Sequence, residues 1–132
     1  MPRKESLYPA DWLKIAEKDL KRVKSLIKIN DPEAAGFYLQ QAVEKFLKAF
    51  LLANGWKLDR IHDLEALLNG ALRYDPSLEI YRDACQKITG FYMVERYPLI
   101  VETGLTIVDI RKSLTDIKKL IEKLRKAVKT VK

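Results

Sequence analysis

Residues 40–48 read Gln40-Gln41-Ala42-Val43-Glu44-Lys45-Phe46-Leu47-Lys48, the centre of the longest dense helical pattern in the chain, which covers residues 35–53. At about 100° per residue, apolar side chains gather on one broad face, and they are Leu39, Ala42, Val43, Phe46, Ala49, Phe50 and Ala53. Gln40, Glu44 and Lys48 fall opposite, where Glu44 and Lys48 form an i,i+4 pair that we expect to be exposed. The pattern predicts an amphipathic helix whose apolar face joins the core.

Two polar side chains of this helix, Gln41 and Lys45, lie at the edge of the apolar stripe and not opposite to it. On the helical wheel they stand near Tyr38 and Leu52. A polar pair in that position could line a groove, so both are candidate site residues.

Length and composition bound the class of protein. A chain of 132 residues with 48% hydrophobic content suits one domain, residues 1–132, with one core. Cys85 is the only cysteine, so no internal disulfide is possible, and there is no signal peptide or long apolar run. We therefore expect a soluble, cytoplasmic protein without a membrane segment. With no Cys cluster, one histidine and no HExxH pattern, we expect no structural zinc site, and no cofactor is indicated.

The formal charge of +7 is concentrated at the C-terminal end. Residues 111–132 hold nine Lys or Arg against two acidic residues, whereas residues 1–110 are balanced at sixteen of each. A basic C-terminal helix at about residues 104–130 is either a solvated face or the main source of attraction to nucleic acid and other anionic surfaces.

The first two helices have clear start and stop signals. The first begins at Tyr8-Pro9-Ala10-Asp11 and runs to about Ile29, with Trp12, Ile15, Ala16, Leu20, Val23, Leu26 and Ile27 on its apolar stripe. Asp31 can cap the second helix, Pro32 takes its first position, and Asn54-Gly55 ends it. The short connection predicts an antiparallel helical hairpin.

Three shorter patterns follow. His62-Asp63-Leu64 begins a brief third helix that ends near Leu72, and after a turn at residues 74–77 a fourth helix carries Leu78, Tyr81, Cys85, Ile88 and Tyr92 on one stripe. The last helix has apolar residues at alternating spacings of 3 and 4 from Ile107 to Val131, a seam suited to packing in a bundle or across a dimer. The chain is therefore predicted to be all-α, an up-down bundle of four to five helices.

Asp19 stands near the middle of the first apolar stripe. An ionised carboxylate there needs a cationic partner or several donors if it is buried, and otherwise it lies at a solvent-open seam between helices. Arg96 extends the stripe of the fourth helix, and Pro98 places it in the last turn. Arg96 is thus the expected cation for Asp19.

Four motifs occur in order: residues 16–20, residues 40–48, His62-Asp63-Leu64 and Arg96-Tyr97-Pro98. Together they resemble the HEPN family (higher eukaryotes and prokaryotes nucleotide-binding domain) over about residues 10–128. The resemblance implies a helical bundle that is usually a homodimer. It also implies a minimal nucleotidyltransferase as partner, in many cases in a toxin–antitoxin pair.

Some members of that family are metal-independent ribonucleases, with an Arg followed after about four to six residues by a His. In this chain Arg96 occupies the Arg position, but Val101, Glu102 and Thr103 stand where the His is expected. The only histidine, His62, lies 34 residues earlier. Since Arg would stabilise phosphate and His would move the proton, this departure argues against a catalytic site, and no residue is assigned a catalytic role.

If the helices pack as the resemblance implies, one polar cleft could bind a nucleotide or RNA, lined by Asp19, Gln41, Lys45, His62 and Arg96. Lys45 and Arg96 would contact phosphate, and Gln41 or Asp19 would meet a base or ribose. Tyr92 or Tyr97 could stack on a base, although such aromatics are commonly core. His62 is alternatively a helix-start residue with a local hydrogen bond.

Three functions remain open at this point. The first is a non-catalytic nucleotide- or nucleic-acid-binding module that pairs with a nucleotidyltransferase. The second is a ribonuclease toxin that uses Arg96 and another base. The third is a structural dimeric interaction protein.

Overall fold

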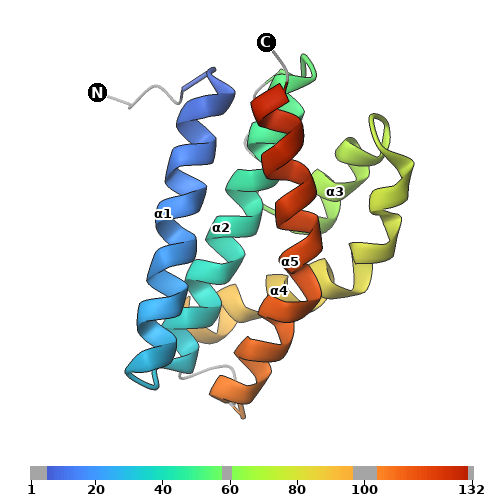
Figure 1. The fold of residues 1–132 in the computed structure, drawn as a ribbon. Helices are drawn as coiled ribbons and strands as arrows, with labels where there is room; N and C mark the ends of the chain where they lie inside the picture. Colours follow the sequence, from blue (N-terminus) through green and yellow to red (C-terminus); the bar gives the residue numbers. More distant parts are fainter. Residues whose placement is uncertain (1–5, 58–60, 97–103, 131–132) are drawn as a thin grey trace.

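The structure is a computed structural model that describes residues 6–57, 61–96 and 104–130, with backbone alone for residues 92–96. Its elements in chain order are α1 (Pro9–Lys28), α2 (Pro32–Ala53), α3 (Leu64–Leu72), the 3-10 helix η1 (Pro76–Tyr81), α4 (Arg82–Arg96) and α5 (Ile107–Thr130). Figure 1 shows the long helices α1, α2 and α5 alongside one another, with α3 to one side and α4 crossing behind α5 and α2. The all-α prediction is confirmed.

The predicted helix boundaries follow from local chemistry. Asp31 caps α2 by accepting a hydrogen bond from the backbone N–H of Ala34 at 3.2 Å, and Pro32 is the first helical residue. Gly55 ends α2 with φ +89°, a conformation that glycine adopts without strain. The α1–α2 turn is short, so these helices form the expected antiparallel hairpin.

The third helix begins later than predicted. Asp63 accepts a hydrogen bond from the backbone N–H of Glu65 at 3.1 Å and is the N-cap, so α3 starts at Leu64 and His62 precedes the helix. In the predicted turn at residues 74–77, Asp75 likewise accepts from Ser77 and starts the 3-10 helix η1.

Helix α2 is the centre of the molecule, because α1, α3, α4 and α5 all pack against it. The prediction that Gln40, Glu44 and Lys48 lie on an exposed face is therefore wrong, since these side chains are buried. A wheel separates apolar from polar residues, but it does not show that other helices cover the polar side as well. On α1 a side chain predicted to be buried is exposed instead. Ile15 is predicted on the apolar stripe but is 45% exposed, because α1 lies at the edge of the bundle.

The apolar seam of α5 packs inside the bundle. Its buried residues are Ile110, Ile117, Leu120, Ile121, Leu124 and Val128, and α5 contacts α2, α1, α4 and η1. Of the two uses considered for this seam, the structure shows packing within one chain. Val131 lies outside the described residues.

A close crossing joins α2 to α4. A Cβ placed on Gly36 would lie 2.9 Å from Cβ of Phe91, so α4 can approach α2 only because this position has no side chain. The buried apolar side chains of all these helices form one core cluster. Within the described ranges, no helix has both the length and the apolar character that a membrane crossing requires.

Candidate functional site

Asp19 forms two short ion pairs between α1 and α2. Its Oδ2 accepts from Nζ of Lys45 at 2.6 Å, and its Oδ1 accepts from Arg22 one turn along α1 at 2.6 Å. The Asp19 side chain is 2% exposed, whereas Lys45 is 17% and Arg22 is 44% exposed. The buried carboxylate thus holds two cations at the edge of the α1–α2 interface.

The prediction that Asp19 needs a cationic partner is confirmed, and the alternative of a solvent-open seam is wrong. The expected partner is Arg96, whose backbone ends α4 but whose side chain lies outside what the structure describes. Arg22 is a partner that the sequence prediction missed, although its i,i+3 spacing from Asp19 is a usable signal. One carboxylate between two cations leaves a surplus of one positive charge.

A shallow hollow of about 370 Å³ adjoins this cluster, between α1 and Tyr38 of α2. Its lining residues are Lys18, Lys21, Arg22, Ser25, Leu26 and Tyr38. The guanidinium of Arg22 lies over the Tyr38 ring, 5.4 Å from its centroid, and Phe37 meets Tyr38 edge-on at 5.3 Å. The hollow therefore combines surplus positive charge with an aromatic ring that is fixed from two sides.

A second polar cluster is buried on another side of α2. Glu44 accepts hydrogen bonds from Lys48 and Gln40, each at 3.3 Å, and Gln40 also donates to the backbone carbonyl of His62. Lys48 is 1% exposed, and its Nζ lies 5.2 Å from the ring centroid of Trp12. The Glu44 carboxylate and the Trp12 ring compensate the charge of the buried Lys48 ammonium. Through these contacts the cluster connects α2 to α1 and to the segment that precedes α3.

His62 reaches this second cluster from outside. Its Nδ1 lies 3.3 Å from Glu44 Oε2 while its side chain stays 67% exposed. The expected local hydrogen bond is thus replaced by a contact with α2. One ring nitrogen thus contacts Glu44, and most of the imidazole faces solvent.

The predicted site residues divide between these clusters. Asp19 and Lys45 are in direct contact, and Gln41 is half-buried on α2 one turn before Lys45. His62 belongs to the Glu44 cluster and not to the Asp19 pair. Tyr97 and the side chains of Tyr92 and Arg96 lie outside the described residues. The phosphate contact predicted for Arg96 and the base stacking predicted for the tyrosines stay predictions.

Nucleophilic and metal chemistry find no support in the described part of the chain. Burial raises the pKa of the Cys85 thiol to about 12, so the thiolate form is scarce at neutral pH. Among the described residues, no group of three or more His, Cys, Asp or Glu is arranged to hold a metal ion. What the clusters present to solvent is positive charge, one aromatic ring and one oriented imidazole.

Comparison with known proteins gives two matches. The family model described as the HEPN domain matches residues 9–132. The crystal structure of TT1696 from Thermus thermophilus superposes with a TM-score of 0.73 at 23% identity, covering 90% of this chain and 97% of that chain. At that identity the likeness shows the fold. No curated protein matches the chain.

Proposed function

The chain belongs to the HEPN family, and on that basis we propose that it is a non-catalytic nucleotide-binding module whose binding site is the hollow beside Arg22 and Tyr38. The observation that carries the proposal is the pairing of one buried carboxylate, Asp19, with two cations. The cluster keeps a positive charge at the rim, where a phosphate can reach it.

The roles of the side chains follow from their geometry. Arg22 has five N–H donors, of which one is bound to Asp19 at 2.6 Å, so the guanidinium keeps donors for a phosphate oxygen. Lys18 and Lys21 line the same hollow and add charge. The Tyr38 ring offers a face on which a base can stack in place of Arg22. Asp19 acts as a positioning residue, because it is too buried to meet a ligand.

The proposal includes two partners. We propose a homodimer and an association with a minimal nucleotidyltransferase in a toxin–antitoxin-like pair. The support is family membership together with the absence of a His at residues 101–103. A module that lacks a proton-transfer residue beside Arg96 fits a role in presenting a substrate to another enzyme. Light scattering of the purified protein tests the dimer, and a monomer would contradict it.

Calorimetric titration with ATP, and separately with a 5′-phosphorylated trinucleotide of RNA, tests the binding site. Arg22→Gln removes the surplus charge while Lys45 still pairs with Asp19, so we expect at least about a tenfold loss of affinity. Arg73→Gln, an exposed residue outside this hollow, is the matched control and should bind normally. Equal affinity of both variants for both ligands would refute the site.

A specific observation keeps ribonuclease activity as a second candidate. Glu44 fixes the exposed imidazole of His62, which is the arrangement expected of a general base. The candidate requires Arg96 near His62, and the Arg96 side chain lies outside the described residues. Its test is the cleavage assay described in the Discussion.

A further inference from the structure

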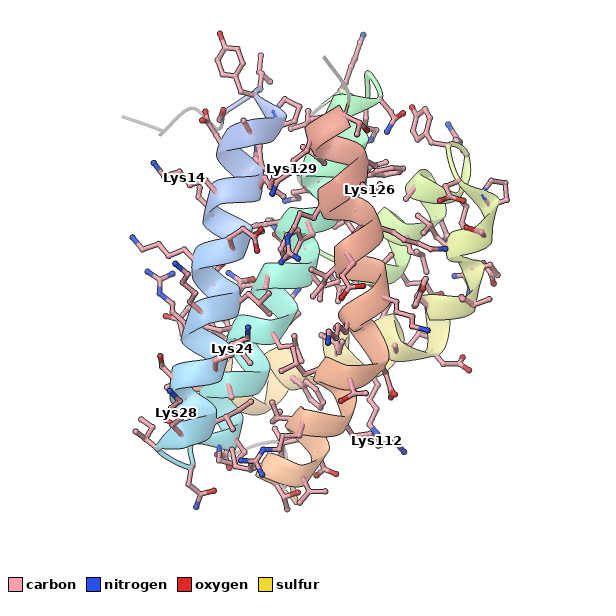
Figure 2. All side chains as sticks on the ribbon, viewed as in Figure 1. Lys14, Lys24, Lys28, Lys112, Lys126 and Lys129 are labelled. Atoms are coloured by element: carbon pink, nitrogen blue, oxygen red, sulfur yellow. The ribbon has the colours of Figure 1, made fainter. Side chains whose placement is uncertain are left out.

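A second basic surface lies where α1 and α5 run next to each other. Figure 2 shows Lys14, Lys24 and Lys28 on α1 and Lys112, Lys126 and Lys129 on α5 on this side of the molecule. The sequence places the excess charge in residues 111–132, whereas the fold adds Lys14, Lys24 and Lys28 of α1 to the same face. We call this surface the α1–α5 face.

A groove runs between the two helices of this face. It has a volume of about 300 Å³, with Leu20, Leu114 and Ile121 at its floor and Lys24, Thr115, Lys118, Glu122 and Arg125 at its rims. Arg125 is already engaged, because it donates to both carboxylate oxygens of Glu17 at 2.6 and 2.7 Å. This bidentate bridge fixes α5 to α1 and leaves the lysines as the available charges.

Five of the labelled lysines on this face are available to bind a ligand. Across the ranges that the structure describes, none of Lys14, Lys24, Lys28, Lys126 and Lys129 forms an ion pair. By the helical rise of 1.5 Å per residue, the row from Lys14 to Lys28 is about 21 Å long. Unpaired cations in rows on two neighbouring helices match a ligand with regularly repeated negative charge.

Charge, and not apolar area, determines the kind of ligand. Leu20 and Ile121 at the floor are only 9% and 3% exposed, so an apolar side chain of a protein partner would gain little by covering them. Among the described residues that line the groove none is aromatic, so these residues offer no stacking platform for the unpaired bases of a single strand. A base-paired helix presents its phosphate backbone and requires neither feature.

We propose that the α1–α5 face binds the phosphate backbone of a base-paired nucleic acid, for which an RNA duplex is the probe, without reading its sequence. Lys24 and Lys118 stand on opposite rims of the groove and contact phosphates from the two sides. Glu122, at the α5 rim, opposes binding. The surface is separate from the hollow at Arg22 and Tyr38, and its use does not depend on nucleotide binding there.

The test compares two double variants with equal change of net charge. Lys24→Gln/Lys118→Gln removes one exposed cation from each rim. Arg73→Gln/Lys123→Gln is the matched control, because Arg73 follows α3 and the Lys123 ammonium lies 5.9 Å from the Tyr81 ring, on the η1 side of α5. The probe is an RNA duplex of about 20 base pairs and arbitrary sequence, and its binding is measured by fluorescence anisotropy between about 50 and 300 mM salt. The slope of the logarithm of the binding constant against the logarithm of the salt concentration changes by about one unit per phosphate contact.

We expect the rim variant to bind about tenfold more weakly and to lose about two units of salt slope, while the control binds as wild type. Glu122→Gln should bind more tightly than wild type. Equal weakening of both double variants would show non-specific attraction and overturn the proposal, as would unchanged binding of the rim variant. Tighter binding of single-stranded RNA, or of a polyglutamate peptide of equal charge, would overturn it as well. Arg22→Gln should leave duplex binding unchanged, which separates this surface from the proposed nucleotide site.

Discussion

Lys45 and Asp19 join α2 to α1 through an ion pair of 2.6 Å in which the carboxylate is 2% exposed. The pair has a structural role in the hairpin, and it also positions Arg22 at the rim of the proposed nucleotide site. Stability and binding therefore depend on the same carboxylate.

Replacing Asp19 with Asn should destabilise the protein by about 2 kcal/mol, because the half-buried Lys45 loses its counter-charge. Urea denaturation at neutral pH measures this loss of unfolding free energy. Asp83→Asn is the control, since Asp83 is exposed on α4. If both variants unfold at the same urea concentration, the Asp19 pair contributes nothing to stability.

The buried pair of Lys48 and Glu44 gives a prediction about coupling. Lys48→Met leaves the Glu44 carboxylate buried without the ammonium that pairs with it, and the unfolding free energy should fall by about 3 kcal/mol. The double variant Glu44→Gln/Lys48→Met removes both charges and should recover at least about 1 kcal/mol of that loss. Denaturant unfolding of the two single variants and the double variant completes the cycle. Strictly additive losses would contradict the coupling.

Gly36→Ala should destabilise the protein by about 1–3 kcal/mol, since the added Cβ would meet the Phe91 side chain at 2.9 Å. Gly90→Ala on α4 is the opposite case, because no atom of the described residues lies within 4 Å of a Cβ placed there. There the better helix propensity of alanine should stabilise by up to about 1 kcal/mol. Thermal melts followed by circular dichroism distinguish the two, and a stabilised Gly36→Ala would contradict the close crossing.

The start of α5 predicts a pH dependence. Hydrogen bonds from the backbone N–H and the hydroxyl of Thr106 lower the pKa of Asp109 below its ordinary 3.8. A carboxyl with a lowered folded pKa contributes stability that is present above the unfolded pKa and is lost as pH falls through the folded pKa. Wild type should thus melt above Asp109→Asn at about pH 7, and the difference should shrink below about pH 4. A difference that stays constant down to about pH 2 would contradict this assignment.

An RNA-cleavage assay in EDTA should show no cutting by wild type or by Arg96→Ala. The expected His is absent from residues 101–103, and a proton-transfer group at Arg96 would have to come from elsewhere. Cleavage by wild type that is lost in both Arg96→Ala and His62→Ala would establish the ribonuclease candidate in place of the binding module.

The parts of the fold that the sequence predicts correctly are those set by local chemistry. Asp31 and Pro32 start α2, and Gly55 ends it, because caps and backbone preferences act within a few residues. The wheel of α2 also identifies its apolar core face. It cannot identify the burial of Lys48, which depends on Trp12 and Glu44 being brought around the ammonium by the tertiary fold.

The candidate site shows the same division. Asp19 is recognisable as a charge in an apolar stripe, and its need for a cation follows from the cost of burying it. Which cations meet it depends on how α1 and α2 cross, so spacing alone does not identify Lys45 as a partner. Arg22 has one sequence signal, its i,i+3 spacing from Asp19. Tyr38 has none that points to a site, and only its contact with Arg22 across the hairpin marks it.

The central position of α2 has a consequence for how the molecule opens. Since α1, α3, α4 and α5 all pack on it, local detachment of α1, α3 or α5 leaves α2 covered by the remaining helices, and only complete unfolding frees it. The backbone amides of residues 39–51 should therefore be the last to exchange with deuterium, at a rate set by global unfolding.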